Sequence, residues 1–123
     1  MDESDLHRVF DLEKRRFART YPHCDRATLS LVAFRRRSAR DCARCFADDL
    51  DVQFHPDVVP ALTYGQCVAL VRHELAHCCR PDLGEAATDS LAELLGGEPI
   101  FYGEDEVQTL DPGVRPRPPH LPR

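Results

Sequence analysis

Hydrophobic residues recur along the first half of the chain with two spacings, which predict one helix followed by short strands. Over residues 5–20 the apolar positions have the spacing of a single helix face, and charged residues fill most other positions. Pro22 marks the end of this helix. Three short segments rich in apolar and β-prone residues follow, at 27–34, 42–47 and 51–59. Because Pro56 cannot donate to a strand ladder, we expect the third segment at a sheet edge.

The pattern then changes to that of a longer helix with a clear beginning and end. Thr63 and Gln66 have the spacing of a capping box, in which each side chain bonds the other residue's backbone N–H. The helix should extend to about Cys79, because Pro81 disfavours helical geometry in the residue before it.

A second helix is expected to begin at Asp82, its candidate N-cap, and to end at Gly96–Gly97. The elements predict an α+β fold: an N-terminal helix, a small three-stranded, mainly antiparallel sheet and two further helices. We assign residues 1–110 to one domain. Residues 111–123 include five prolines and almost no core-forming side chains, so we expect a flexible tail.

Composition narrows the class of protein. A chain of 123 residues with 42% hydrophobic residues fits one small domain. Its net charge of -5 argues against a general nucleic-acid binder. The N-terminus is charged and lacks the apolar region of a signal peptide, and no apolar run is long enough to span a membrane. We therefore expect a cytoplasmic protein without a membrane partner, and we predict no particular oligomeric state.

The chain has six cysteines, which the cytosol would keep as free thiols or metal ligands. Cys42 and Cys45 form a C-x-x-C pair, but no second pair follows at the spacing of a zinc ribbon. Cys67 and Cys78 lie at helical positions that look buried. We expect them to act as small apolar core residues rather than as a second zinc site.

The strongest chemical signal is the pentapeptide H-E-x-x-H within the capped helix. His73 and His77 are four residues apart, so their rings lie on one helix face and can reach a single metal ion. Glu74 lies one position round the helix, where it is placed to hold a metal-bound water rather than the metal. This pattern predicts a zinc site with Glu74 as general base.

A catalytic zinc usually has three protein ligands, so a third is expected downstream. Glu85 and Asp89 are four apart on the next helix, whose face a short turn would fold back toward the histidines. Glu85 could instead complete a capping box with Asp82. In that case Asp89 would be the ligand.

With E-x-x-x-D following H-E-x-x-H, residues 73–77 and 85–89 resemble the motifs of gluzincin-type zinc metallopeptidases. The chain looks like a minimal zincin domain, similar to small bacterial and phage-encoded proteins. The resemblance covers roughly residues 28–102. It implies one Zn²⁺ ion, with Glu85 as a ligand and Asp89 supporting the first histidine. If Glu85 caps its helix, Asp89 would bind the metal, as in aspartate-type zincins.

The expected function is peptide-bond hydrolysis by a metal-activated water, with a peptide or protein as substrate. An extended peptide could pair with the strand at 51–59. Tyr102 and His55 are candidates for stabilising the oxyanion by residue type alone. Packing under the second helix is the simpler explanation for Tyr102, and a partly exposed strand position is the simpler one for His55.

The alternative is a non-catalytic protein on a zincin scaffold, a bacterial or phage regulator or assembly factor that acts by binding. A basic cluster could serve such a role, although a solvated turn is the simpler explanation in an acidic chain. The cluster comprises Arg35, Arg36, Arg37 and Arg40.

Overall fold

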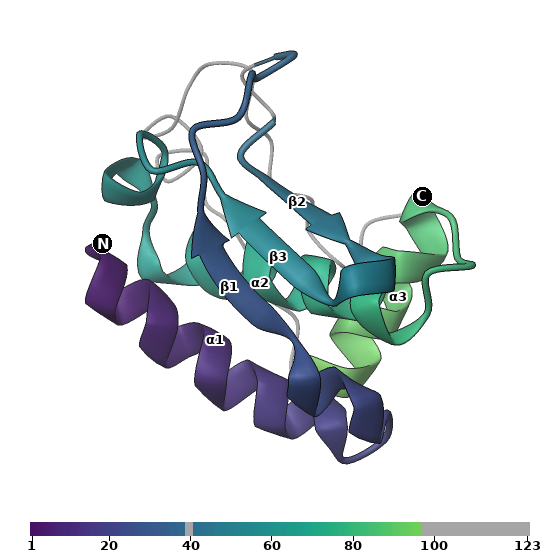
Figure 1. Cartoon of the computed structure of the whole chain (residues 1–123). Helices are drawn as coiled ribbons and strands as arrows, with labels where there is room; N and C mark the ends of the chain where they lie inside the picture. The colour runs from purple at the N-terminus through teal and green to yellow at the C-terminus, as the bar shows by residue number, and fades with distance from the viewer. Residues whose placement is uncertain (39–40, 97–123) are drawn as a thin grey trace.

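The computed structural model describes residues 1–38 and 41–96, which form the predicted α+β fold. Helix α2 lies behind a three-stranded sheet, and α1 and α3 both pack against α2 (Figure 1). The helices are α1 (Glu3–Ala18), α2 (Tyr64–Cys79) and α3 (Glu85–Gly96). The strands are β1 (Thr28–Leu31), β2 (Ala43–Phe46) and β3 (Asp51–Phe54). Short 3-10 helices lie at η1 (Pro22–Arg26), η2 (Ala47–Asp49) and η3 (Val59–Ala61). Within the described residues, no helix is long and apolar enough to cross a membrane.

The strand order corrects two expectations about the sheet. The order is β1-β3-β2, with β3 parallel to β1 and antiparallel to β2, so the sheet is mixed rather than mainly antiparallel. The prediction that the segment 51–59 forms an edge strand is wrong, because β3 lies in the centre. The strand ends at Phe54, and Pro56 therefore lies beyond the ladder, where it costs no hydrogen bond. The two edges are β1 and β2.

Helix α2 begins and ends where the sequence predicts. Thr63 Oγ1 accepts a hydrogen bond from the Gln66 backbone N–H, and Gln66 Oε1 accepts one from the Thr63 N–H. The last helical residue is Cys79, two positions before Pro81. Most of the helix is buried, because it contacts the sheet on one side and the other two helices elsewhere. The helix that bears the two histidines is therefore the most buried of the three described helices.

Helix α3 begins later than expected. Asp82 does not cap it, since both of its carboxylate oxygens bond the guanidinium of Arg80, at 2.9 and 2.7 Å. The helix starts at Glu85 instead, and the backbone N–H and the hydroxyl of Thr88 both donate to the Gly84 carbonyl. The later start places Glu85 in the first turn.

A buried ion pair joins α1 to α2. The Arg72 guanidinium donates two hydrogen bonds to the Glu13 carboxylate, at 3.1 and 3.2 Å, and both residues are almost fully buried. Arg16 donates to the carbonyl of Gly96, the last residue of α3. Gly96 lies so close to this pair that an added Cβ would be 2.6 Å from Arg72 Cδ. The end of α3 is thus packed onto the ion pair.

Candidate metal centre

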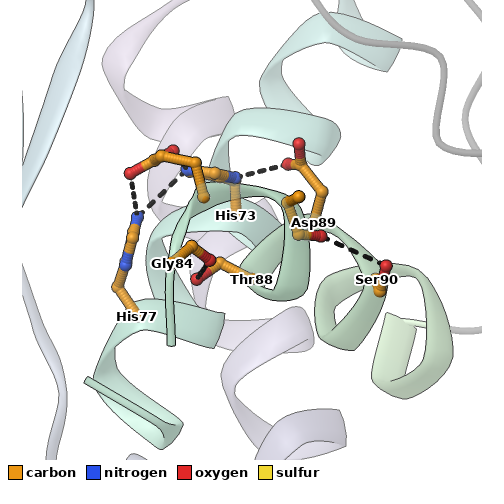
Figure 2. A network of polar contacts seen from close by, with 8 residues as sticks. His73, His77, Gly84, Thr88, Asp89 and Ser90 are labelled. Atoms are coloured by element: carbon orange, nitrogen blue, oxygen red, sulfur yellow. Dashed lines mark hydrogen bonds and ion pairs between the residues drawn. The ribbon is translucent and has the colours of Figure 1, made fainter. Parts of the chain in front are cut away.

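Two helices bring three candidate metal ligands together. His73 and His77 project from one face of α2, and their Nε2 atoms are 3.1 Å apart (Figure 2). The Glu85 carboxylate at the start of α3 reaches both rings, 3.0 Å from His73 Nε2 and 3.2 Å from His77 Nε2. The three ligand atoms lie within 4.8 Å of one another. This group can hold a metal ion.

The second acidic residue of α3 contacts the other side of the first imidazole. Asp89 Oδ1 is 2.6 Å from His73 Nδ1, and Figure 2 shows the Asp89 side chain directed at that ring. Glu85 and Asp89 are one helical turn apart, so they reach opposite nitrogens of the same histidine. The carboxylate near both Nε2 atoms is that of Glu85, and it makes no capping box with Asp82.

The pKa values of the two histidines shift in opposite directions. Burial lowers the pKa of His73, but the hydrogen bond to Asp89 and the charges of the neighbouring carboxylates outweigh it, so the pKa is raised. Burial and the charge of His73 hold the pKa of His77 below its usual value. Of the two imidazoles, His73 is therefore the one whose surroundings favour the protonated, positively charged form. A metal ion would take the place of that positive charge.

Glu74 differs from the other carboxylates in its burial. Its side chain lies in the interior, and burial raises its pKa to about 7, with His73 opposing the shift and Glu85 and Asp41 adding to it. Glu85, in contrast, has a side chain that is 61% exposed. A carboxyl with a pKa near neutrality can both take up and release a proton at physiological pH.

The candidate oxyanion stabilisers do not join this group among the described residues. His55 is buried beyond the end of β3, rather than partly exposed in a strand, and its ring packs edge-on against Phe34 with centroids 5.3 Å apart. His55 Nδ1 also accepts the Asp57 backbone N–H at 3.2 Å. These contacts give His55 a structural role. Tyr102 lies outside the described residues, as do residues 111–123.

The basic cluster has local partners. The side chain of Arg36 donates to the Asp41 carbonyl, and the backbone N–H of Arg37 donates to the Asp41 carboxylate. Arg40 lies outside the described residues. These bonds tie Arg36 and Arg37 to Asp41, so the contacts give these two residues a structural role.

The cysteines form no further three-ligand group within residues 1–38 and 41–96. Cys67 and Cys78 are buried in the core, as predicted. The two cysteines of the C-x-x-C pair have different surroundings. Cys42 is buried in the core, whereas Cys45 faces Cys78 at an Sγ–Sγ distance of 3.1 Å. Sequence spacing does not reveal this contact, since 33 positions separate the two residues.

Searches against models of protein families, curated proteins and solved structures found no match to this chain. Function is therefore inferred from the geometry of the chain's own residues.

Proposed function

We propose that the protein is a zinc-dependent metallopeptidase. The observation that carries the proposal is the convergence of two imidazole nitrogens and one carboxylate within 4.8 Å. Two histidines and a glutamate are a ligand set of catalytic zinc sites, in which a water takes the fourth position. A purely structural zinc site more commonly has four protein ligands with cysteine among them.

The ligand roles follow from which nitrogen each carboxylate contacts. His73 and His77 would bind zinc through Nε2, and Glu85 would supply an oxygen. Asp89 would accept the Nδ1–H of His73, which fixes the tautomer that leaves Nε2 free to bind metal. Bound zinc supplies a water of lowered pKa and polarises the substrate carbonyl.

Glu74 would carry the proton transfers. It follows His73 on the same helix, and its carboxyl is buried beside the ligand group. In the proposed reaction its carboxylate accepts a proton from the attacking water and then donates it to the leaving amine. This is the role of the glutamate in H-E-x-x-H.

The mixed sheet changes where a peptide substrate would pair. β3 has a strand on each side, so it offers no free backbone groups. β2 is the edge strand that packs against α2, the helix of the two histidines. We infer that an extended peptide would align along β2, using main-chain hydrogen bonds for affinity.

The test combines metal content with turnover. The purified protein should hold one zinc per chain and cleave members of a mixed peptide library, with products identified by mass spectrometry. Glu74→Gln should keep the zinc and lose cleavage by at least ~100-fold. Glu93→Gln, the same substitution made on α3 at a residue that is not a proposed ligand or base, should keep both.

Two results would contradict the proposal. Cleavage by the Glu74→Gln variant at the parent rate would exclude Glu74 as the general base. Stoichiometric zinc in a parent protein that cleaves no library peptide would instead favour the non-catalytic alternative, in which the metal supports a binding protein.

A further inference from the structure

Helix α2 ends in two adjacent cysteines, and each meets a thiol from another element. Cys78 Sγ is 3.1 Å from Cys45 Sγ on β2. Cys79 lies beside Cys24 of η1, whose thiol raises the pKa of Cys79. The core thus contains two thiol pairs, and none of the six cysteines is joined in a disulfide.

We propose that Cys45 and Cys78 are a site of oxidative modification, which forms a reversible disulfide on reaction with a low-molecular-weight disulfide such as oxidised glutathione. The two sulfur atoms already face each other across the contact between the sheet and the helix. A disulfide requires about 2.05 Å between them, so closure needs an approach of only about 1 Å.

The position of Cys45 makes that approach feasible. It lies on β2, which among residues 1–38 and 41–96 is an edge strand that pairs with β3 alone, and Cys45 is opposite Val52 there. Cys78 is in the last turn of α2, where the helix is held by its contacts with the core. A small shift of the edge strand toward the helix would close the bond.

Exposure separates this pair from the second one. Cys45 is partly exposed, whereas Cys24 and Cys79 are 0% and 4% exposed. Of the two pairs, Cys45–Cys78 is therefore the one that we expect a reagent the size of glutathione to reach, whereas both members of the Cys24–Cys79 pair are buried.

The exchange balances in two steps. The hydrogen bond with Cys78 and burial raise the pKa of Cys45, so the exchange proceeds through its small thiolate fraction. This thiolate attacks one sulfur of oxidised glutathione, breaks its S–S bond and releases one glutathione thiolate. The Cys78 thiolate then attacks Cys45 Sγ and expels the second glutathione thiolate. The two thiols lose two electrons and two protons, which leave with two molecules of reduced glutathione.

The disulfide would join the edge strand to the helical turn that bears His77. Cys78 follows His77 directly, so the cross-link would fix the distance between β2 and the metal-binding end of α2. Its formation needs neither metal nor turnover. Disulfide formation can therefore be tested independently of the proposed peptidase activity.

The experiment uses the full chain, treated with a chelator and then incubated with oxidised glutathione. After quenching and denaturation, free thiols are counted and disulfides are mapped by non-reducing mass spectrometry. We expect the count to fall from six to four, with one linked peptide pair containing Cys45 and Cys78. Dithiothreitol should restore six.

Variants provide the controls. Cys45→Ser should retain all five of its thiols, whereas Cys67→Ala, a buried thiol outside both pairs, should fall from five to three. The melting temperature of the oxidised parent should rise by on the order of 10 °C, because the bond closes a loop of more than 30 residues.

Mapping of the parent decides the question even if a variant fails to fold. Six remaining thiols, or a linked pair other than Cys45 with Cys78, would overturn the proposal. Loss of two thiols in Cys45→Ser would do so as well.

Discussion

The contact between Asp89 and His73 should control how tightly the metal group binds zinc. The bond is short, at 2.6 Å, and the two side chains are only 12% and 15% exposed. Solvent therefore screens the carboxylate weakly, and a hydrogen bond of this charged kind is worth about 1.5–3 kcal/mol. Asp89→Asn keeps the shape and an acceptor oxygen but removes the charge.

The expected loss of zinc affinity can be estimated from this hydrogen bond. Removing a carboxylate behind a ligating histidine typically costs about 10–100-fold in metal affinity, or roughly 1.4–2.7 kcal/mol. The estimate agrees with the charged hydrogen bond, so we expect Asp89→Asn to weaken zinc binding by about 10–100-fold. A competition titration of the chelator-treated protein against a chromogenic zinc chelator measures this directly.

Asp82→Asn is the matched control for this experiment. Asp82 is exposed and its carboxylate pairs with Arg80, so its loss should change zinc affinity by less than about twofold. The reasoning would be refuted if Asp89→Asn bound zinc as tightly as the parent. Equal weakening by both variants would show a general effect of charge instead.

Three further predictions concern the ligands and the packing around them. Glu85→Gln should lower the zinc content after dialysis from one per chain to near zero, as measured by elemental analysis, and retention of the metal would exclude Glu85 as a ligand. In the metal-free protein, burial raises the Glu74 pKa to about 7, compared with about 4.5 in the unfolded chain. The buried neutral carboxyl therefore contributes stability that is fully present below pH 4.5 and is lost as pH rises through about 7. Urea unfolding should therefore find Glu74→Gln more stable than the parent at pH 8 by about 2–3 kcal/mol and little changed at pH 4; equal stability at pH 8 would contradict this. Gly96→Ala should lower the free energy of unfolding by about 1–3 kcal/mol, because its Cβ would be 2.6 Å from Arg72 Cδ, which Glu13 holds in place. A gain in stability, the usual effect of alanine in a helix, would show that Arg72 moves freely.

Local signals were sufficient to predict α2, whereas the start of α3 depended on a competing interaction. The capping box at Thr63 and the proline at position 81 act on the backbone next to them, so they can be recognised in sequence. Asp82 is equally suited to cap a helix, but its carboxylate bonds Arg80 instead. The choice between these two partners depends on the path of the turn, which residue type does not specify.

The three strands could be recognised from their composition, but their arrangement could not. Strand order and direction depend on pairing between distant segments, and β3 pairs with β1 in parallel across more than 20 residues. Pro56 was a misleading signal, because the predicted segment extended five residues past the true end at Phe54. A strand that stops before its proline can occupy the centre of a sheet.

At the metal centre, too, contacts within one helix could be predicted from the sequence, whereas contacts between helices could not. The helical period alone places His73 and His77 together, and the structure has them so. Glu85 and Asp89 share one face of α3, so sequence spacing could not decide which would reach the Nε2 atoms. The late start of α3 decides it, since it brings the first-turn residue over both rings and leaves Asp89 beside His73 Nδ1.

This arrangement links metal binding to the position of α3. The helix is anchored at its last residue by the bond from Arg16 to the Gly96 carbonyl, and at its first residue Glu85 faces the two histidines. Glu85 is largely exposed, so without a metal ion its attraction to the imidazoles is weakened by solvent. A bound ion would replace that weak contact with coordination bonds to both helices. Part of the metal's binding free energy would then hold α3 against α2, as expected for a small domain whose core is modest.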